Sequence, residues 1–314
     1  MSIIKCNELL YIRRSVPDVT QVETFLNRFG LITCAKQGES VYLRATDPVH
    51  HCYILEQGSA RLLGFAFLAK CEADLRTLAA GTGRDVEEIA EPGGGLRVRL
   101  KEPNGYDVDI VYGIAVPAPI NVERQAVNTG REPTLRADEP LRLPRGQATP
   151  VKRIAHVVLG TPLVEETAAW FRETLGMLPS DEVFRTAGGE QIASFLRVDK
   201  GAEHVDHHAF LPMRSDTAGF QHVSFEAQDI DAVMADHHYL KSMGYEHLWG
   251  IGRHLLGSQL FDYWNDPLGY AHEHWADSDR LSATATTGVW EAKEGMVTQW
   301  GEGASEQFRH NVKP

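Results

Sequence analysis

The sequence has few cysteines, no long hydrophobic run and a shortage of positive charge. Lysine and arginine total 31 against 43 acidic residues, a formal net charge of −12, and this balance argues against a nucleic-acid partner. No apolar run has the length of a membrane span, and the start, MSIIKCNELL, lacks a signal-peptide pattern. The cysteines have no Cys-x-x-Cys spacing, so we expect a reduced, cytoplasmic protein: Cys6, Cys34, Cys52 and Cys71.

At 314 residues the chain suits two domains of ordinary size, and 43% hydrophobic with 24% charged residues is typical of a globular protein. Strand and helix patterns of the first part recur in the second, which predicts an internal repeat. We place one copy in residues 1–114, a proline-rich connector in 115–150, the second copy in 151–280 and a tail in 281–314.

One stretch, residues 252–273 (GRHLLGSQLFDYWNDPLGYAHE), concentrates the polar residues of interest. Apolar residues between His254 and Tyr263 predict one strand, Asp-Pro-Leu-Gly predicts a tight turn, and residues 270–275 predict the partner strand. In such a hairpin Glu273 and Tyr263 can face the same cavity.

Two histidines in predicted strands can join this carboxylate, His156 in RIAHVVL and His222 in FQHVSFE. Two imidazoles and one carboxylate on a metal leave positions open, which is the ligand pattern of non-haem Fe(II) enzymes that bind a substrate and O2. Aligning the two copies places Tyr11, Gly64 and Asp109 where the second copy has His156, His222 and Glu273. We therefore expect the first copy to be free of metal.

Together, His156, His222, His254, Tyr263 and Glu273, in this order and context, resemble the type I extradiol ring-cleavage dioxygenases of the vicinal oxygen chelate superfamily. The resemblance implies an α+β fold of tandem paired βαβββ modules in two domains. It also implies a metal held by His156, His222 and Glu273, namely Fe(II), with Mn(II) as the alternative.

The resemblance further assigns His254 and Tyr263 to hydrogen bonds with the bound substrate, and an acid–base histidine to the segment VDHHAFLP. The spacing to His222 favours His208 there, with His207 as the other candidate. Val158 and Leu256, each two residues beyond a site histidine, are expected to line the substrate pocket. His237 and His238, on a predicted helix, are expected to be exposed rather than ligands.

The function implied is cleavage of a catechol-type diol or triol beside its hydroxyls, with insertion of both atoms of O2, in the degradation of aromatic compounds. Catechol, bicyclic diols such as 2,3-dihydroxybiphenyl, and trihydroxytoluene all remain open as substrates. We expect no partner beyond substrate and O2 except further copies of the chain in a homo-oligomer. The alternatives are another metal-dependent enzyme of this fold, such as a glyoxalase-like isomerase or an epoxide-opening transferase, and a non-catalytic binding module.

Overall fold

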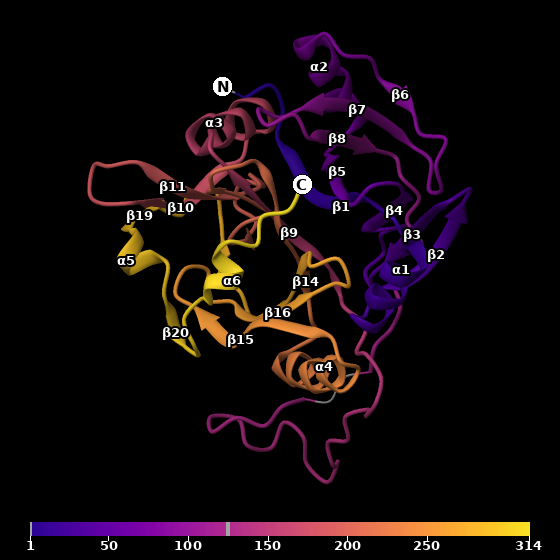
Figure 1. Cartoon of the computed structure of the whole chain (residues 1–314), viewed down its shortest axis with the longest axis vertical. Coiled ribbons are helices and arrows are strands. Elements are labelled where there is room, and N and C mark those ends of the chain that lie inside the picture. Colours follow the sequence, from indigo (N-terminus) through magenta and orange to yellow (C-terminus); the bar gives the residue numbers. More distant parts are fainter. Residues whose placement is uncertain (1, 124–125) are drawn as a thin grey trace.

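The computed structural model describes residues 2–123 and 126–314, and two similar series of elements follow one another along the chain (Figure 1). The first series is β1 (Cys6–Val16), α1 (Val19–Arg28), β2 (Ile32–Gln37), β3 (Ser40–Arg44), β4 (Tyr53–Gln57), β5 (Arg61–Ala69), α2 (Glu72–Thr82), β6 (Glu87–Glu88), β7 (Leu96–Lys101) and β8 (Asp107–Tyr112). The order is that of two βαβββ units.

The second series repeats this order with one short strand added. It consists of β9 (Arg153–Thr161), α3 (Val164–Leu175), β10 (Leu178–Phe184), β11 (Gln191–Arg197), β12 (Val205–Asp206), β13 (Phe210–Arg214), β14 (Gly219–Glu226), α4 (Ile230–Ser242), β15 (Glu246–His254), β16 (Leu260–Asn265) and β17 (Ala271–Ala276). The tail adds β18 (Arg280–Leu281), β19 (Gly288–Glu291), α5 (Ala292–Gly295), β20 (Thr298–Trp300) and α6 (Glu306–Arg309).

Within the described residues the strands form two large mixed sheets. The N-terminal sheet has the order β2-β3-β4-β1-β5-β8-β7-β6, and the C-terminal sheet the order β19-β10-β11-β13-β9-β14-β17-β16-β15-β20. With few helices beside them, these sheets confirm the predicted α+β fold of paired βαβββ modules. Whether the predicted boundaries at residues 114, 150 and 280 separate independent domains stays a prediction.

Strand registers confirm the alignment of the two copies. Ser224 on β14 lies opposite both His156 on β9 and Glu273 on β17. In the N-terminal sheet, Ala66 on β5 lies opposite both Tyr11 on β1 and Asp109 on β8. Tyr11 and Asp109 therefore occupy the positions of His156 and Glu273.

A buried interface joins the two sheets. Arg14 on β1 is fully buried and donates to Asp266 and to Tyr53, each at 2.8 Å, while its guanidinium lies 3.7 Å from the ring centroid of Tyr270. Phe29, at the end of α1, stacks on His274 at 3.7 Å between ring centroids. The N-terminal copy thus supports the back of the hairpin β16–β17.

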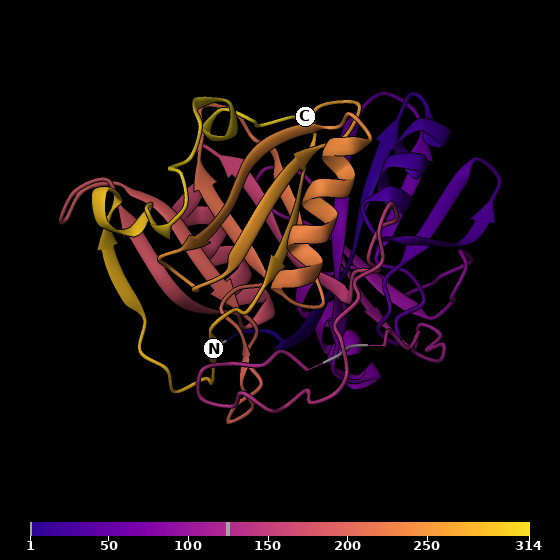
Figure 2. The same cartoon turned by 90° about the horizontal axis from the view of Figure 1, so that it is seen from below.

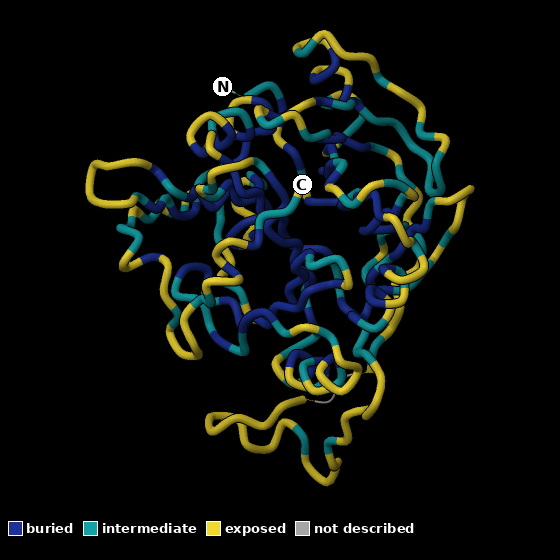
Figure 3. The backbone as a smooth tube through the Cα atoms, in the orientation of Figure 1, coloured by how far each residue is buried: buried dark blue, intermediate teal, exposed yellow. Residues whose placement is uncertain are grey.

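The connector, residues 115–150, contains neither helix nor strand in its described part and is mostly exposed (Figure 3). Residues 124 and 125, like Met1 of the first copy, lie outside the described residues. Near its end, Thr149 donates its backbone N–H to Asp236 on α4 at 2.8 Å. Within the described residues, no helix combines the length and the apolar character that crossing a membrane requires.

The tail is built into the C-terminal sheet. Strand β19 pairs with β10 and strand β20 with β15, so the tail extends the C-terminal sheet at both edges. Phe308 is buried, and the indole of Trp290 donates to Asp181 at 2.7 Å. Trp300, in contrast, is 45% exposed.

Candidate metal centre and active site

The three predicted ligands converge at the centre of the C-terminal sheet. His156 Nε2 lies 2.9 Å from Glu273 Oε2 and 3.2 Å from His222 Nε2. His222 Nε2 lies 3.5 Å from the same carboxylate oxygen. All three residues are buried, and their ligand atoms lie within 4.8 Å of one another.

The sheet explains why residues distant in sequence meet here. Strand β14 runs between β9 and β17, so one residue of each neighbour stands beside it. Glu273 points towards the histidines, whereas His272 and His274, which flank it, point to the other face by strand alternation and contact Tyr53 and Phe29 of the N-terminal copy.

The turn before Glu273 fixes the register of the hairpin. Asp266 Oδ1 accepts hydrogen bonds from the backbone N–H groups of Leu268 and Tyr270, at 2.8 and 2.9 Å. Gly269 takes a positive φ of 79°, a conformation that glycine adopts without a steric penalty. Tyr263 and Glu273 are consequently direct cross-strand partners.

The donor set fits a divalent metal. Among the described residues, no hydrogen bond of good geometry reaches either carboxylate oxygen of buried Glu273, and His156 Nδ1 is likewise unpartnered. His222 Nδ1 contacts the side-chain oxygen of Gln221, which leaves Nε2 free to face the centre. A buried carboxylate without a hydrogen-bond donor, beside two imidazole nitrogens, is arranged as ligands around a cation are.

The protonation states of Glu273 and His222 also suit a metal site. Burial alone would raise the pKa of Glu273, but the adjacent His156 and His222 hold it well below its ordinary value. Burial lowers the pKa of His222 to about 4. The carboxylate is therefore ionised and the imidazole of His222 neutral near pH 7, which are the forms that bind metal.

His254 and Tyr263 lie at the rim of this centre. His254 Nε2 is 3.0 Å from the Tyr263 hydroxyl and 3.8 Å from Glu273 Oε1. Contrary to the expectation of one strand between them, His254 ends β15 and Tyr263 lies within β16, because residues 255–259 form the connection between these strands. The two side chains still meet, since β15 and β16 pair.

His207 and His208 have different surroundings. The ring of His208 lies 4.1 Å, centroid to centroid, from that of His156, whereas His207 Nε2 lies 2.7 Å from Asp181 Oδ2. Their Nδ1 atoms are 3.1 Å apart. Both residues precede β13, which begins at Phe210. Burial holds the pKa of His208 well below its ordinary value, so its imidazole is neutral.

Val158 and Leu256, the predicted lining residues, are buried in one apolar cluster near the centre. The cluster also receives Trp290 and Ala292 from the tail, and its other members come from the strands β10, β11 and β13: Val183, Ala193, Phe195 and Leu211. Phe308 adds an aromatic wall, with its ring centroid 4.6 Å from that of Tyr263.

Several of these neighbours were missed by the sequence reasoning. Asp181, Gln221 and Phe308 have no motif or spacing that distinguishes them, and only the fold brings them to the centre. A second group of potential ligands was also missed: His237, His247 and Asp262 offer ligand atoms within 4.8 Å of one another. His237, expected to be a solvent-facing helix residue, thus has a buried carboxylate as its neighbour.

The N-terminal copy has a different set at the equivalent place. Tyr11 donates to Asp109 at 2.9 Å, and Arg99 donates to both oxygens of Asp109 at 2.7 and 2.8 Å. The repeat extends further than expected, because His51 stands two residues before Tyr53 as His208 stands two before Phe210. An arginine already neutralises the carboxylate of this copy.

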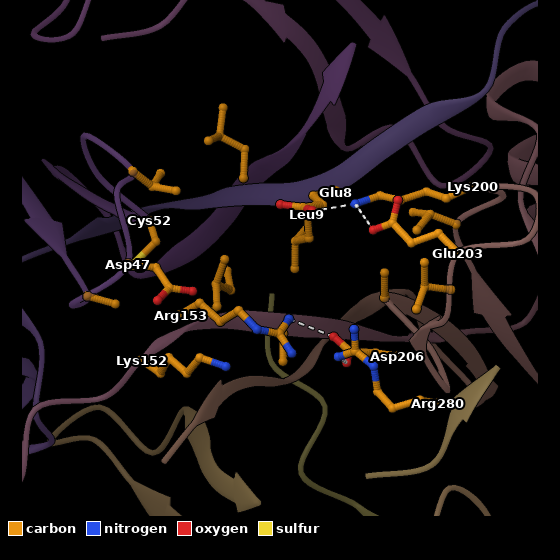
Figure 4. A pocket seen from close by; sticks show the side chains of 18 residues that line it. Glu8, Leu9, Asp47, Cys52, Lys152, Arg153, Lys200, Glu203, Asp206 and Arg280 are labelled. Carbon is orange, nitrogen blue, oxygen red and sulfur yellow. Dashed lines mark hydrogen bonds and ion pairs between the residues drawn. The ribbon is translucent and has the colours of Figure 1, made fainter. Parts of the chain in front are cut away.

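A separate cleft of about 240 Å³ lies between β1 and the start of β9 (Figure 4). Its charged residues largely pair with each other: Lys200 contacts Glu8 and Glu203, and Arg153 contacts Asp206 at 2.6 Å. The three predicted metal ligands are not among the residues that line it. The cleft is therefore separate from the group formed by His156, His222 and Glu273.

Comparison with known proteins agrees with this geometry. Residues 153–273, which contain all three predicted ligands, match the model of the Glyoxalase/Bleomycin resistance protein/Dioxygenase superfamily and form a domain of that superfamily. The resemblance to vicinal oxygen chelate proteins is thereby confirmed.

Individual relatives give a more specific comparison than the superfamily model. The chain is a homologue of metapyrocatechase 2 from Cupriavidus necator, with 28% identity over 95% of this chain and 90% of the relative. It is 25% identical to a manganese-dependent 2,3-dihydroxybiphenyl 1,2-dioxygenase from Geobacillus genomosp. 3, over 77% of this chain and 76% of that protein. It shares its fold with the Mn(II)-bound glyoxalase from Novosphingobium aromaticivorans, at a TM-score of 0.79 and 22% identity, over 96% of this chain and 94% of that one.

Proposed function

We propose that the chain is an extradiol ring-cleavage dioxygenase that opens a catechol-type diol or triol with both atoms of O2. The observation that carries this proposal is the arrangement around Glu273, which has the imidazoles of His156 and His222 beside one carboxylate oxygen and His254, paired with Tyr263, beside the other. A metal-binding centre alone is common to the superfamily, whereas the added hydrogen-bonding pair suits a substrate that carries negative charge on oxygen.

In this proposal His156, His222 and Glu273 hold the metal. When bound, the metal would keep the diol and O2 next to each other and carry electron density between them. Fe(II) is the metal proposed. Mn(II) is the alternative, because it accepts the same ligands and because one relative is named as manganese-dependent and one fold neighbour as Mn(II)-bound.

His254 and Tyr263 are proposed to orient the substrate. Their side chains, 3.0 Å apart, present an imidazole and a phenol to the same space beside Glu273. Burial and the charge of Glu273 keep the pKa of Tyr263 well above its ordinary value, so its hydroxyl stays protonated and can donate. Donors held in a buried site stabilise developing charge on oxygen without having to reorganise.

His208 is proposed as the acid–base group, because its ring packs against that of His156 while His207 turns to Asp181. A histidine so placed can accept a proton from one hydroxyl of the diol and return it to the ring-opened product. His207 and Asp181 then act as positioning residues, since the contact between the two Nδ1 atoms ties His208 to a fixed neighbour.

The apolar cluster of Val158, Leu256 and Phe195 is proposed to receive the aromatic ring. Small-molecule sites are generally lined by apolar side chains with a few polar groups for orientation. A buried, largely aliphatic wall favours an uncharged ring substituent over a carboxylate. A role in aromatic degradation, a cytoplasmic location and a homo-oligomer are proposed with this function.

A glyoxalase-like isomerase is the second candidate, favoured by the likeness to the Mn(II)-bound glyoxalase. One experiment separates the two. The chain is loaded anaerobically with Fe(II) or with Mn(II), mixed with catechol, and exposed to air in an oxygen electrode. We expect one O2 consumed per catechol and a yellow ring-opened product.

The His222→Ala variant, which lacks a proposed ligand, is the control and should consume no O2. A panel of catechol, 2,3-dihydroxybiphenyl and a trihydroxybenzene covers the substrate classes. If the metal-loaded chain consumes no O2 with any diol of the panel, ring cleavage is refuted, and a hemithioacetal isomerase assay then tests the second candidate.

A further inference from the structure

A second group of metal-ligand side chains lies on the other face of the C-terminal sheet. His237 belongs to α4, His247 to β15 and Asp262 to β16. Helix α4 packs against these strands (Figure 2). Asp262 precedes Tyr263 in the same strand, and strand alternation turns the two side chains to opposite faces.

The ligand atoms are close and converge on one carboxylate oxygen. Asp262 Oδ1 lies 3.1 Å from His237 Nδ1 and 2.8 Å from His247 Nε2. In a tetrahedral zinc site with ligand distances of about 2.0–2.1 Å, neighbouring ligand atoms stand roughly 3.3 Å apart. The two separations from Asp262 Oδ1 are near that value, and the ligand atoms of all three residues lie within 4.8 Å of one another.

The carboxylate is held by a partner that is not itself a ligand. Trp264 Nε1 donates to Asp262 Oδ2 at 2.6 Å, and Asp262 and Trp264 are both fully buried. The same oxygen also lies 3.2 Å from His237 Nδ1. A donor to the second oxygen of a ligand carboxylate is a regular feature of metal sites, because it sets the orientation of the ligand.

Solvent can still reach the group. The side chains of His237 and His247 are 15% and 29% exposed, so a metal ion can enter, and a water molecule can complete its coordination. Two imidazoles, one carboxylate and one water form a four-coordinate set that suits Zn²⁺.

We propose that His237, His247 and Asp262 form a second divalent-cation site, selective for zinc, that ties α4 to β15 and β16. These strands carry His254 and Tyr263, so the site braces the hairpin that forms the rim of the catalytic centre. The proposal is independent of the reaction assigned to that centre, because it rests on side chains of the opposite face.

The test uses the intact chain loaded with Fe(II) and then dialysed against micromolar Zn²⁺, followed by elemental analysis of both metals. We expect one equivalent of each metal in the unchanged chain. His247→Gln and His237→Gln should keep iron and lose zinc. His238→Gln, which alters the adjacent exposed histidine of the same helix, should keep both.

A stability measurement complements the metal count. Zinc should raise the midpoint of thermal unfolding of the unchanged chain and of His238→Gln, since a ligand that binds only the folded state stabilises it. The midpoints of His237→Gln and His247→Gln should not move with zinc. Equal zinc content in the unchanged chain and in these two variants, or no zinc retained by the unchanged chain, overturns the proposal.

Discussion

Tyr11 donates a hydrogen bond of 2.9 Å to Asp109 at the positions where the second copy brings His156 to 2.9 Å from Glu273. The same scaffold thus carries a phenol–carboxylate hydrogen bond in the N-terminal copy and two proposed metal ligands in the C-terminal copy. In the N-terminal copy, Arg99 also donates to both oxygens of Asp109. The positive charge of Arg99 takes the place of a metal ion, and the buried carboxylate of that copy therefore requires no metal.

Tyr11→Phe tests this assignment. The variant should keep its full iron content and its ring-cleavage activity, because Tyr11 is not a ligand. Its free energy of unfolding should fall by roughly 1–3 kcal/mol, since a buried carboxylate loses one donor while keeping its arginine. Urea denaturation measures the stability and elemental analysis the iron. A loss of iron with unchanged stability would contradict the assignment.

The ligand set of the second copy is tested by His222→Ala. The variant should fold, bind little iron and have no ring-cleavage activity, because two ligands remain and one coordination position is lost. Circular dichroism checks the fold, and iron is measured after anaerobic loading and desalting. His310→Ala, in the tail, is the control. Near-stoichiometric iron in His222→Ala would remove that residue from the ligand set.

His208→Phe should retain iron and bind catechol, because neither step needs the proton. Ring cleavage should slow by roughly 10²–10⁴-fold, the usual size of an acid–base contribution. His207→Gln, which can still donate to Asp181, should have a much smaller effect on the turnover rate. Stopped-flow measurement of product formation compares the two. If His207→Gln is the crippled variant and His208→Phe turns over normally, the two roles are exchanged.

His51, buried in the N-terminal copy, predicts a dependence of stability on pH. Burial, aided by the neighbouring His50, lowers the pKa of His51 from 6.5 to about 3. Below pH 6.5 the unfolded chain therefore binds a proton at this position that the folded chain does not. The contribution of His51 to the free energy of unfolding is therefore fully present above pH 6.5 and decreases as the pH falls. At pH 5 the free energy of unfolding is lower by about 2 kcal/mol on this account.

His51→Phe should remove this contribution. The difference in the free energy of unfolding between pH 7.5 and pH 5 should be about 2 kcal/mol smaller than in the unchanged chain. Urea denaturation at the two pH values measures it, with His310→Phe, at an exposed position, as the control. An equal pH dependence in all three proteins would show that the pKa of His51 does not differ enough between the folded and unfolded states to affect stability in this range.

The sequence by itself determined the features that depend on local spacing and on repetition. Tyr263 and Glu273 pair because the Asp-Pro-Leu-Gly turn sets the hairpin register, and both the turn and the alternation are visible in the residues. The internal repeat predicted two copies of one scaffold, and the family resemblance implied that the scaffold is an α+β fold of paired modules. It also predicted which copy would bring two histidines and a carboxylate together.

Only the tertiary structure decided what depends on packing between distant segments. It turned His208 rather than His207 towards His156, because Asp181 on β10 engages His207. It also brought His237 of α4 against Asp262, two residues for which no local pattern predicts a contact. Alternation along a strand determines which face of the sheet a side chain points to. Which residue of a helix, a tail or a second sheet it then contacts depends on how these layers pack together.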